Sequence, residues 1–174
     1  MEKEFKEILI DEDQIKNKVK ELGQKITNDF RGKELVAICI LKGAVVFFAD
    51  LIREITIPLE IDFMAVSSYG TSSQSSGAVQ ILKDLDAGVE GKHLLIVEDI
   101  VDTGLTLNYL LGNLYSRKPA SISTCAFLDK PDSRKVNVAI DYCAIEIPDV
   151  FVVGYGLDYA QKYRHLPYVA VLKT

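Results

Sequence analysis

The chain has 174 residues, of which 48% are hydrophobic and 26% charged, and its formal net charge is −5. This size and composition are typical of a single globular domain spanning residues 1–174, and no apolar run approaches the ~18 residues that a membrane span needs. The negative charge argues against non-specific nucleic-acid binding, which usually needs a basic surface. The charged first residues lack the apolar stretch of a signal peptide, so we expect a cytoplasmic protein.

Helical and strand patterns alternate along the chain. Apolar residues at helical spacing predict a helix over 12–30, and Asp11 with Gln14 predicts a capping box at its start. The nearly continuous apolar run at 34–41 predicts a central parallel strand, buried on both faces. The other predicted elements are helices over 43–55 and 103–118 and strands over 59–66, 79–84, 93–101, 121–128, 142–147, 151–155 and 167–172. Strands that alternate with helices predict an α/β fold with a mostly parallel twisted sheet flanked by helices.

One polar stretch interrupts this order. Residues 67–77 read SSYGTSSQSSG and carry no charge. An interdomain linker has this composition, but the flanking segments are too short for two separate cores, and 79–84 has the pattern of a strand returning from a long hairpin. A long polar loop inside a compact domain is more often a functional lid than an accident, which favours a lid, with an idle flexible hairpin as the alternative.

The most unusual stretch is 94–106, which reads LLIVEDIVDTGLT. A buried strand runs directly into three carboxylates, Glu98, Asp99 and Asp102. Acidic side chains left unpaired near a core are costly, so either the turn is solvated or a positively charged group is held there. In open α/β sheets, ligands bind beyond the carboxyl ends of the strands, which is where these acids are expected to lie.

The residues that follow suit a phosphate group. The start of a helix offers unpaired N–H groups and a partial positive charge, Gly104 lets the backbone come close, and Thr103 and Thr106 add hydroxyl donors. The neighbouring carboxylates suit sugar hydroxyls and Mg²⁺, which prefers oxygen ligands. A phosphorylated sugar that carries a metal fits both the carboxylates and the helix start. Two alternatives remain: Thr103 is a simple N-cap with acids that favour the helix dipole, or the chain is a receiver-like phosphoacceptor, which leaves the serine-rich loop unexplained.

The sequence VEDIVDTGLT closely resembles the phosphoribosyl-pyrophosphate motif of the type I phosphoribosyltransferases. Further motifs narrow the resemblance to the hypoxanthine (hypoxanthine-guanine) phosphoribosyltransferases of bacterial type; these are LKGA at 41–44, SSYG at 67–70, LDKP at 128–131, FVVGYGLDY at 151–159 and Arg164. The resemblance covers essentially the whole chain. It implies the type I phosphoribosyltransferase fold, with a small hood and a mobile hairpin lid.

The resemblance implies roles for the acidic turn. Glu98 and Asp99 are expected to hold the ribose hydroxyls and the metal bound to them. Asp102 is the candidate general base for the purine N7 proton. The 5′-phosphate is expected on the loop formed by Asp102, Thr103, Gly104, Leu105 and Thr106. Leu105 stands where some relatives have a lysine, and the backbone donors of the loop make that difference tolerable.

On the purine side, the resemblance implies that Lys130 donates to the purine O6, that Phe151 stacks on the base and that the backbone of Val152 reads its edge. Ser68 and Tyr69 are expected in the lid. Each assignment has an alternative when the residue is taken alone. Lys130 before a proline is typical of an ordinary loop lysine, and a lone phenylalanine is more often a core residue.

For the pyrophosphate, the resemblance implies contacts from Lys42 and Gly43, through a loop that in this family carries a non-proline cis peptide bond. Asp158 is expected to bind a second Mg²⁺ there, so that the metal ligands are Glu98, Asp99 and Asp158. Arg164 is expected to contact the leaving group. The alternative for Asp158 and Arg164 is a surface ion pair, which contributes little.

The implied reaction is Mg²⁺-dependent transfer of phosphoribose from 5-phosphoribosyl 1-pyrophosphate to hypoxanthine, and to guanine, in purine salvage. The family also implies a homodimer or homotetramer. One alternative is a relative that prefers xanthine. Another is a nucleotide-sensing regulator on the same fold, which should show a basic face and lose the base or the purine-reading residues, whereas Asp102, Lys130 and Phe151 are all present.

Overall fold

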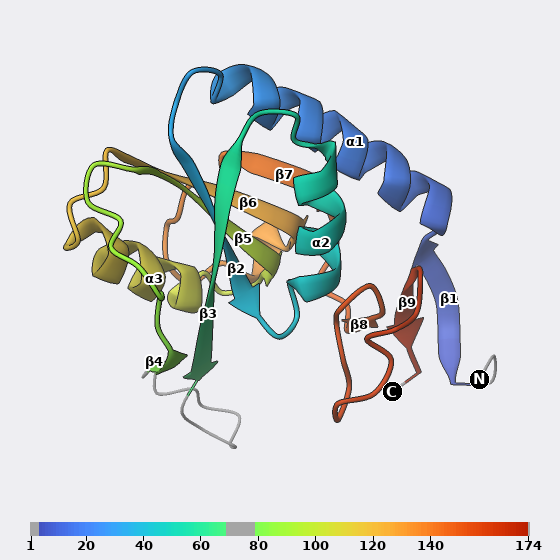
Figure 1. Ribbon diagram of the computed structural model, residues 1–174. Helices are drawn as coiled ribbons and strands as arrows, with labels where there is room; N and C mark the ends of the chain where they lie inside the picture. The colour runs from blue at the N-terminus through green and yellow to red at the C-terminus, as the bar shows by residue number, and fades with distance from the viewer. Residues whose placement is uncertain (1–3, 69–78, 174) are drawn as a thin grey trace.

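A six-stranded sheet forms the centre of the computed structural model, which describes residues 4–68 and 79–173 (Figure 1). Its strand order is β4-β3-β2-β5-β6-β7, and every pair is parallel except β3–β4. The strands are β2 (Leu35–Leu41), β3 (Leu59–Ser68), β4 (Val79–Lys83), β5 (His93–Val101), β6 (Ser121–Asp129) and β7 (Tyr142–Glu146). The predicted mostly parallel α/β sheet is therefore confirmed, as is the returning strand β4.

Helices cover both faces of this sheet. The helices α1 (Glu12–Asp29) and α2 (Val45–Glu54) lie on one face, and α3 (Leu105–Tyr115) lies on the other (Figure 1). The side chains of β2 alternate between two cores: Ala37 packs on the α1–α2 side and Ile38 on the α3 side. Both faces are apolar because both are covered, which explains the continuous apolar run.

The predicted capping box at the start of α1 is present. The Asp11 carboxylate accepts a hydrogen bond from Gln14 N, and the Gln14 side chain accepts one from Asp11 N, both at 2.9 Å. The first turn also carries Glu12 and Asp13, whose charges suit the positive end of the helix dipole. The long α1 is therefore fixed at its N-terminal end by local sequence.

A second, antiparallel sheet lies to one side, in the order β1-β9-β8 (Figure 1). Its strands are β1 (Phe5–Ile10), β9 (Val169–Leu172) and β8 (Val152–Val153). We identify this sheet with the small hood expected beside the main sheet. Strand β1 was not predicted, because its exposed middle carries charges and its partner β9 lies at the other end of the chain.

Two predicted boundaries are wrong, for the same physical reason. The helix predicted over 103–118 begins only after Gly104, whose φ of +84° is left-handed and cannot continue a right-handed helix. Gly104 rather than Thr103 is the N-cap residue, although the Thr103 hydroxyl accepts a hydrogen bond from Leu105 N at 3.3 Å, as the N-cap alternative expects of a capping side chain. The strand predicted over 151–155 shrinks to β8 because Gly154 has a φ of +102°.

The predicted lid over 67–77 falls largely outside the described residues. Its first two residues end β3, while Tyr69 and the rest of the stretch belong to the part that is not described. Strands β3 and β4 pair directly up to Ser68 and Val79, at the edge of the central sheet. Within residues 4–68 and 79–173, no helix is both long enough and apolar enough to span a membrane.

Candidate active site

Much of the site predicted from sequence lines one cavity of about 230 Å³ at the carboxyl ends of β2 and β5. The predicted residues in its lining are Gly43, Glu98, Asp99, Asp102, Thr103, Gly104 and Thr106. This is the edge of the sheet where open α/β folds bind ligands, because the loops there leave a crevice. Leu105, the remaining residue of the phosphate loop, is the first residue of α3 and does not line the cavity.

The two consecutive acids at the end of β5 form a strongly acidic wall. Burial, and then the charge of Asp99, raises the pKa of Glu98 well above its usual value. Burial also raises the pKa of Asp99, to about 6, although a hydrogen bond from Ile100 N (2.7 Å) acts in the opposite direction. Among the described residues, the Glu98 carboxylate has no hydrogen-bond or ion-pair partner. A cation or a set of hydroxyl donors would satisfy this wall.

The turn after β5 presents its backbone to the cavity. The left-handed Gly104 precedes α3, and its φ of +84° disfavours any other residue. A Cβ there would also be tightly placed, 3.0 Å from Val138 Cγ2 and 3.1 Å from Arg134 Cδ. The first N–H groups of a helix have no partners within the helix. Leu105 N donates to Thr103 Oγ1 at 3.3 Å, and the remaining N–H groups of this first turn can serve a ligand. Asp102 at the start of the turn is exposed, and its carboxylate has no hydrogen-bond partner among the described residues.

The loop after β2 approaches the acidic wall closely. The peptide bond before Lys42 is cis. A Cβ added to Gly43 would overlap the Asp99 carboxylate, and one added to Gly156 would overlap the Gly43 carbonyl. Arg164 Nη1 in turn donates to Gly156 O at 2.7 Å. The exposed Lys42 does not line the cavity, but its loop is packed between β5 and the Gly156 region.

Asp158 and Arg164 form an ion pair of 3.0 Å, so the pairing considered as an alternative is present. Their side chains are 27% and 25% exposed, which makes the pair half-buried rather than a surface pair. Among the charges that act on Asp99, that of Arg164 lowers its pKa and that of Asp158 raises it. The pair therefore lies within electrostatic reach of the acidic wall.

The described residues contain no group of three or more His, Cys, Asp or Glu side chains that could hold a metal ion together. Of the predicted ligands, Glu98 and Asp99 share the cavity lining, whereas Asp158 does not line it. Two carboxylates with few partners fit a Mg²⁺ ion that takes its other oxygens from a substrate and from water.

Lys130 is not an ordinary loop lysine. It is 7% exposed, and its backbone N donates to Val101 O at 2.9 Å, which ties it to the end of β5. Its ammonium nitrogen lies 3.6 Å from the carboxylate of Asp149. A buried lysine that keeps a single exposed partner is available to a second acceptor.

Phe151 is likewise not a core residue, because 49% of it is exposed. Its ring packs edge-to-face against Tyr159, with the ring centres 5.9 Å apart at 87°. Val152 beside it is buried in β8 and pairs with Val171. Two exposed aromatic rings beside a buried strand form an apolar platform. Tyr159 had no role in the sequence prediction, although it ends the FVVGYGLDY motif.

The comparisons with known proteins agree with this geometry. The family model for the phosphoribosyl transferase domain matches residues 7–160, so the chain belongs to the phosphoribosyl transferase family. It is 53% identical to the hypoxanthine-guanine phosphoribosyltransferase of Bacillus subtilis (strain 168), over 99% of this chain and 96% of that protein. It is 50% identical to the enzyme of the same name from Mycobacterium tuberculosis (strain ATCC 25618 / H37Rv), over 97% of this chain and 87% of that protein.

Solved structures give the same result. A hypoxanthine phosphoribosyltransferase from Staphylococcus aureus superposes with a TM-score of 0.96 at 49% identity, covering 99% of this chain and 94% of that one. A likeness of this extent includes both the central sheet and the small sheet. The type I phosphoribosyltransferase fold predicted from the sequence motifs is therefore confirmed, whereas the predicted lid lies largely outside the described residues.

Proposed function

We propose that this chain transfers phosphoribose from 5-phosphoribosyl 1-pyrophosphate to N9 of hypoxanthine and of guanine, and releases pyrophosphate. The observation that carries the proposal is the acidic wall of Glu98 and Asp99, which leads within one turn into the helix start at Gly104. A phosphorylated sugar offers hydroxyl groups to the acidic wall and a phosphate to the helix start. The names and the full-length similarity of the relatives point to the same reaction.

In this proposal the sugar phosphate lies along the cavity. The N–H groups and hydroxyls of Thr103 to Thr106 bind the 5′-phosphate, because a helix start favours an anion. Glu98 and Asp99 accept hydrogen bonds from the ribose hydroxyls and hold a Mg²⁺ ion, with Asp158 as ligand of a second one. When bound, the metal supplies positive charge that neutralises the departing pyrophosphate. The same positive charge would neutralise Glu98 and Asp99, which explains why their burial is tolerated.

The pyrophosphate is expected beside the Lys42–Gly43 loop, where Arg164 adds a positive charge. Arg164 is held by Gly156 and Asp158, so it is oriented before the substrate arrives. Fixed donors that face a developing negative charge lower the barrier because they need little reorganisation during the reaction.

The purine is expected between the aromatic platform and Lys130. Phe151 stacks on the ring, the backbone of Val152 reads its edge, and Lys130 donates to O6. Asp102 takes the N7 proton, and its exposed carboxylate has no other hydrogen bond among the described residues to give up. We also infer a homodimer or homotetramer in solution, which light scattering on the purified chain measures.

A spectrophotometric assay with hypoxanthine, guanine, xanthine and adenine, each with and without the pyrophosphate donor, tests the function. We expect turnover of hypoxanthine and guanine that depends on the donor and stops in excess chelator. Turnover of xanthine alone would replace the proposal with a xanthine-preferring relative. Donor binding without turnover of any purine would instead indicate a regulator.

A further inference from the structure

A nearly buried ion pair lies next to the site without being part of the cavity lining. Arg134 Nη2 pairs with Asp129 Oδ1, and the two side chains are 18% and 11% exposed. Buried ion pairs are a weak source of stability, because removing both charges from water offsets most of their attraction. What else Arg134 contacts is therefore more informative than the pair itself.

The second contact of Arg134 is with the acidic turn. Its Nη1 donates to the backbone carbonyl of Asp102 at 3.2 Å. Its partner Asp129 is the last residue of β6 and precedes Lys130 in the chain. One guanidinium group thus connects the strand end that carries the purine-reading Lys130 to the peptide that carries Asp102.

Backbone hydrogen bonds fasten the same two segments on either side of this contact. Lys130 N donates to Val101 O, and Lys135 N donates to Thr103 O, both at 2.9 Å. Among the described residues, however, only Arg134 supplies a hydrogen bond to the Asp102 carbonyl. The carbonyl between the two fastened residues is therefore held by a side chain rather than by the backbone.

We infer that Arg134, held by Asp129, is a positioning residue that fixes the Asp102 peptide so that the carboxylate meets the purine held by Lys130. The inference rests on the proposed function, in which Asp102 is the general base. The Asp102 carboxylate has no partner of its own in the described part of the chain, so the position of its backbone sets which region the carboxylate can reach. The planar guanidinium offers separate donors to Asp129 and Asp102, whereas the single ammonium of a lysine cannot serve both in the same way.

The test compares Arg134→Lys in the wild-type chain and in an Asp102→Asn chain, by steady-state rates and by calorimetric donor binding. In the wild-type chain we expect kcat to fall by about 10- to 100-fold, because small misplacements of a catalytic group cost rates of this order. Donor affinity should change little. In the Asp102→Asn chain the same substitution should have almost no further effect on kcat, because there is no base left to position.

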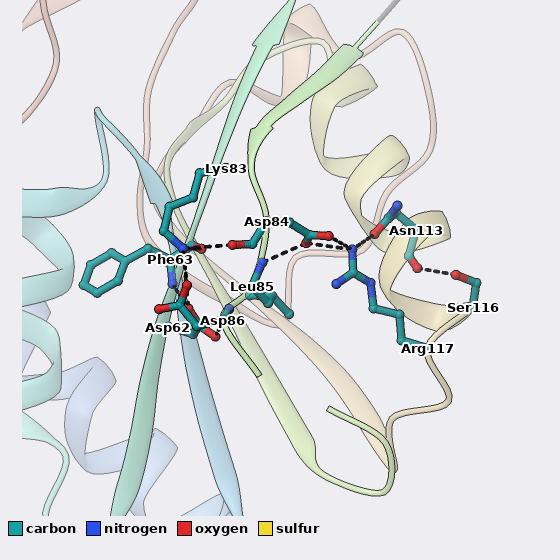
Figure 2. A network of polar contacts seen from close by, with 9 residues as sticks. All are labelled: Asp62, Phe63, Lys83, Asp84, Leu85, Asp86, Asn113, Ser116 and Arg117. Carbon is teal, nitrogen blue, oxygen red and sulfur yellow. Dashed lines mark hydrogen bonds and ion pairs between the residues drawn. The ribbon is translucent and has the colours of Figure 1, made fainter. Parts of the chain in front are cut away.

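Two variants complete the design. Arg117→Lys is the matched control, because Arg117 also makes an ion pair, with Asp84, and a bond to Asn113 at the other end of α3 (Figure 2). It should leave kcat unchanged. Asp129→Asn keeps the size of its side chain but weakens the hold on Arg134, so it should lower kcat in the same direction. If Arg134→Lys lowers the melting temperature strongly, Asp129→Asn decides the question.

The outcomes separate this inference from the proposed function. An unchanged kcat in Arg134→Lys, or an equal loss in both backgrounds, would overturn the positioning role, because Arg134 would then act independently of Asp102. If instead Asp102→Asn alone retains the wild-type kcat, the base assignment in the proposed function fails, and the positioning role fails with it.

Discussion

Gly43 has no room for a side chain, because a Cβ at this position would overlap the Asp99 carboxylate. We predict that Gly43→Ala pushes the loop and the acidic wall apart and lowers kcat/KM by ~10-fold or more, since misplacement by about 1 Å can cost ~100-fold. The change should appear in donor affinity measured by calorimetry as well as in rate. Wild-type donor affinity in this variant would show that the loop and Asp99 are not packed as described.

Gly112 is the matched control for that substitution. It lies in the middle of α3, is exposed, and would have open space around a Cβ. Gly112→Ala should leave activity unchanged and stabilise the fold by roughly 0.5–1 kcal/mol, because glycine in a helix interior is destabilising relative to alanine. The same substitution should therefore lower activity at Gly43 and raise stability at Gly112. Denaturant unfolding measures the gain in stability of Gly112→Ala.

Lys130 is predicted to select 6-oxopurines. The residue is buried, and its one ion-pair partner among the described residues, Asp149, is 68% exposed at its side chain, so the ammonium can also serve a ligand. Lys130→Ala should reduce kcat/KM for hypoxanthine strongly, because a site that donates to an oxygen depends on that hydrogen bond for discrimination. Competition between hypoxanthine and a purine without O6 measures the selection. An unchanged ratio would make Lys130 a purely structural residue.

Single residues differ in how far the sequence alone predicts their position. Glu98, Asp99 and Gly104 are recognisable because acids that directly follow a buried strand and precede a helix start are unusual. Arg134 could not be found in this way, because the carbonyl that it contacts lies 32 residues earlier in the chain. Tyr159 is similar: its ring is placed against Phe151 by the turns between them, which local pattern does not specify.

At the scale of elements, a polar network joins the segment after β4 to the C-terminal end of α3 (Figure 2). Arg117 Nη2 donates to both carboxylate oxygens of Asp84 (2.8 and 3.0 Å) and to Asn113. Lys83 donates to the carbonyls of Asp84 (2.8 Å) and Phe63 (3.3 Å). These contacts fix the connection between β4 and β5 against the helix that begins at the site.

The Asp84 pair should contribute a small stabilisation that depends on pH. Burial raises the pKa of Asp84, but the hydrogen bonds from Arg117 and from Leu85 N, together with the charges of Arg117 and Lys83, outweigh it, so the pKa lies below its usual value. A lowered pKa in the folded state stabilises the fold above the unfolded pKa of ~3.9, and this stabilisation disappears as the pH falls through the folded value. Asp84→Asn should therefore cost ~0.2–1 kcal/mol at pH 7 and less at pH 3. Urea unfolding at both pH values tests this, and a larger cost at pH 3 would contradict it.

Elements with strong local patterns were predictable, whereas the existence of β1 and the extent of β8, which depend on distant pairing, were not. The buried run at β2 and the capping box of α1 each carry their own signal. Strand β1 was not predicted, and β8 was predicted too long, because both pair with β9 near the end of the chain and no short window of sequence contains that information. Periodicity also placed the start of α3 too early, because the left-handed Gly104 separates it from the strand.

At the scale of the whole molecule, the acidic wall serves the proposed function at the expense of stability. A comparison of two buried acids, one with hydrogen-bond partners and one without, shows this. Glu98 and Asp62 are each 7% exposed. The Asp62 carboxylate accepts hydrogen bonds from Phe63 N (2.7 Å) and Asp86 N (2.9 Å), as Figure 2 shows. Glu98 has no such partner among the described residues. Burying an unpaired charge is costly, so Glu98 should lower the stability of the folded chain when no ligand is bound.

We predict that Glu98→Gln raises the stability of the ligand-free chain by about 1 kcal/mol or more at pH 7, while Asp62→Asn lowers it by about 1–2 kcal/mol. Thermal unfolding in the presence of a chelator measures both changes. Addition of the donor with Mg²⁺ should stabilise the wild-type chain, because a ligand that binds only the folded state shifts unfolding, and should stabilise Glu98→Gln much less. Equal destabilisation by both substitutions would mean that Glu98 is a satisfied structural residue.

In the proposed function, Asp102 is the general base and the Thr103–Thr106 loop binds the donor. The substitution Asp102→Asn tests this assignment of roles most directly, with kcat and calorimetric donor binding measured on the same preparation. The substitution keeps size and hydrogen-bonding shape but removes the group that accepts the N7 proton. We predict that kcat falls by ~10²–10⁴-fold, as is typical for loss of a general base, while donor affinity stays close to that of the wild-type chain because the Thr103–Thr106 loop is intact. A kcat within a few-fold of the wild-type value, or a collapse of donor affinity in its place, would contradict this assignment.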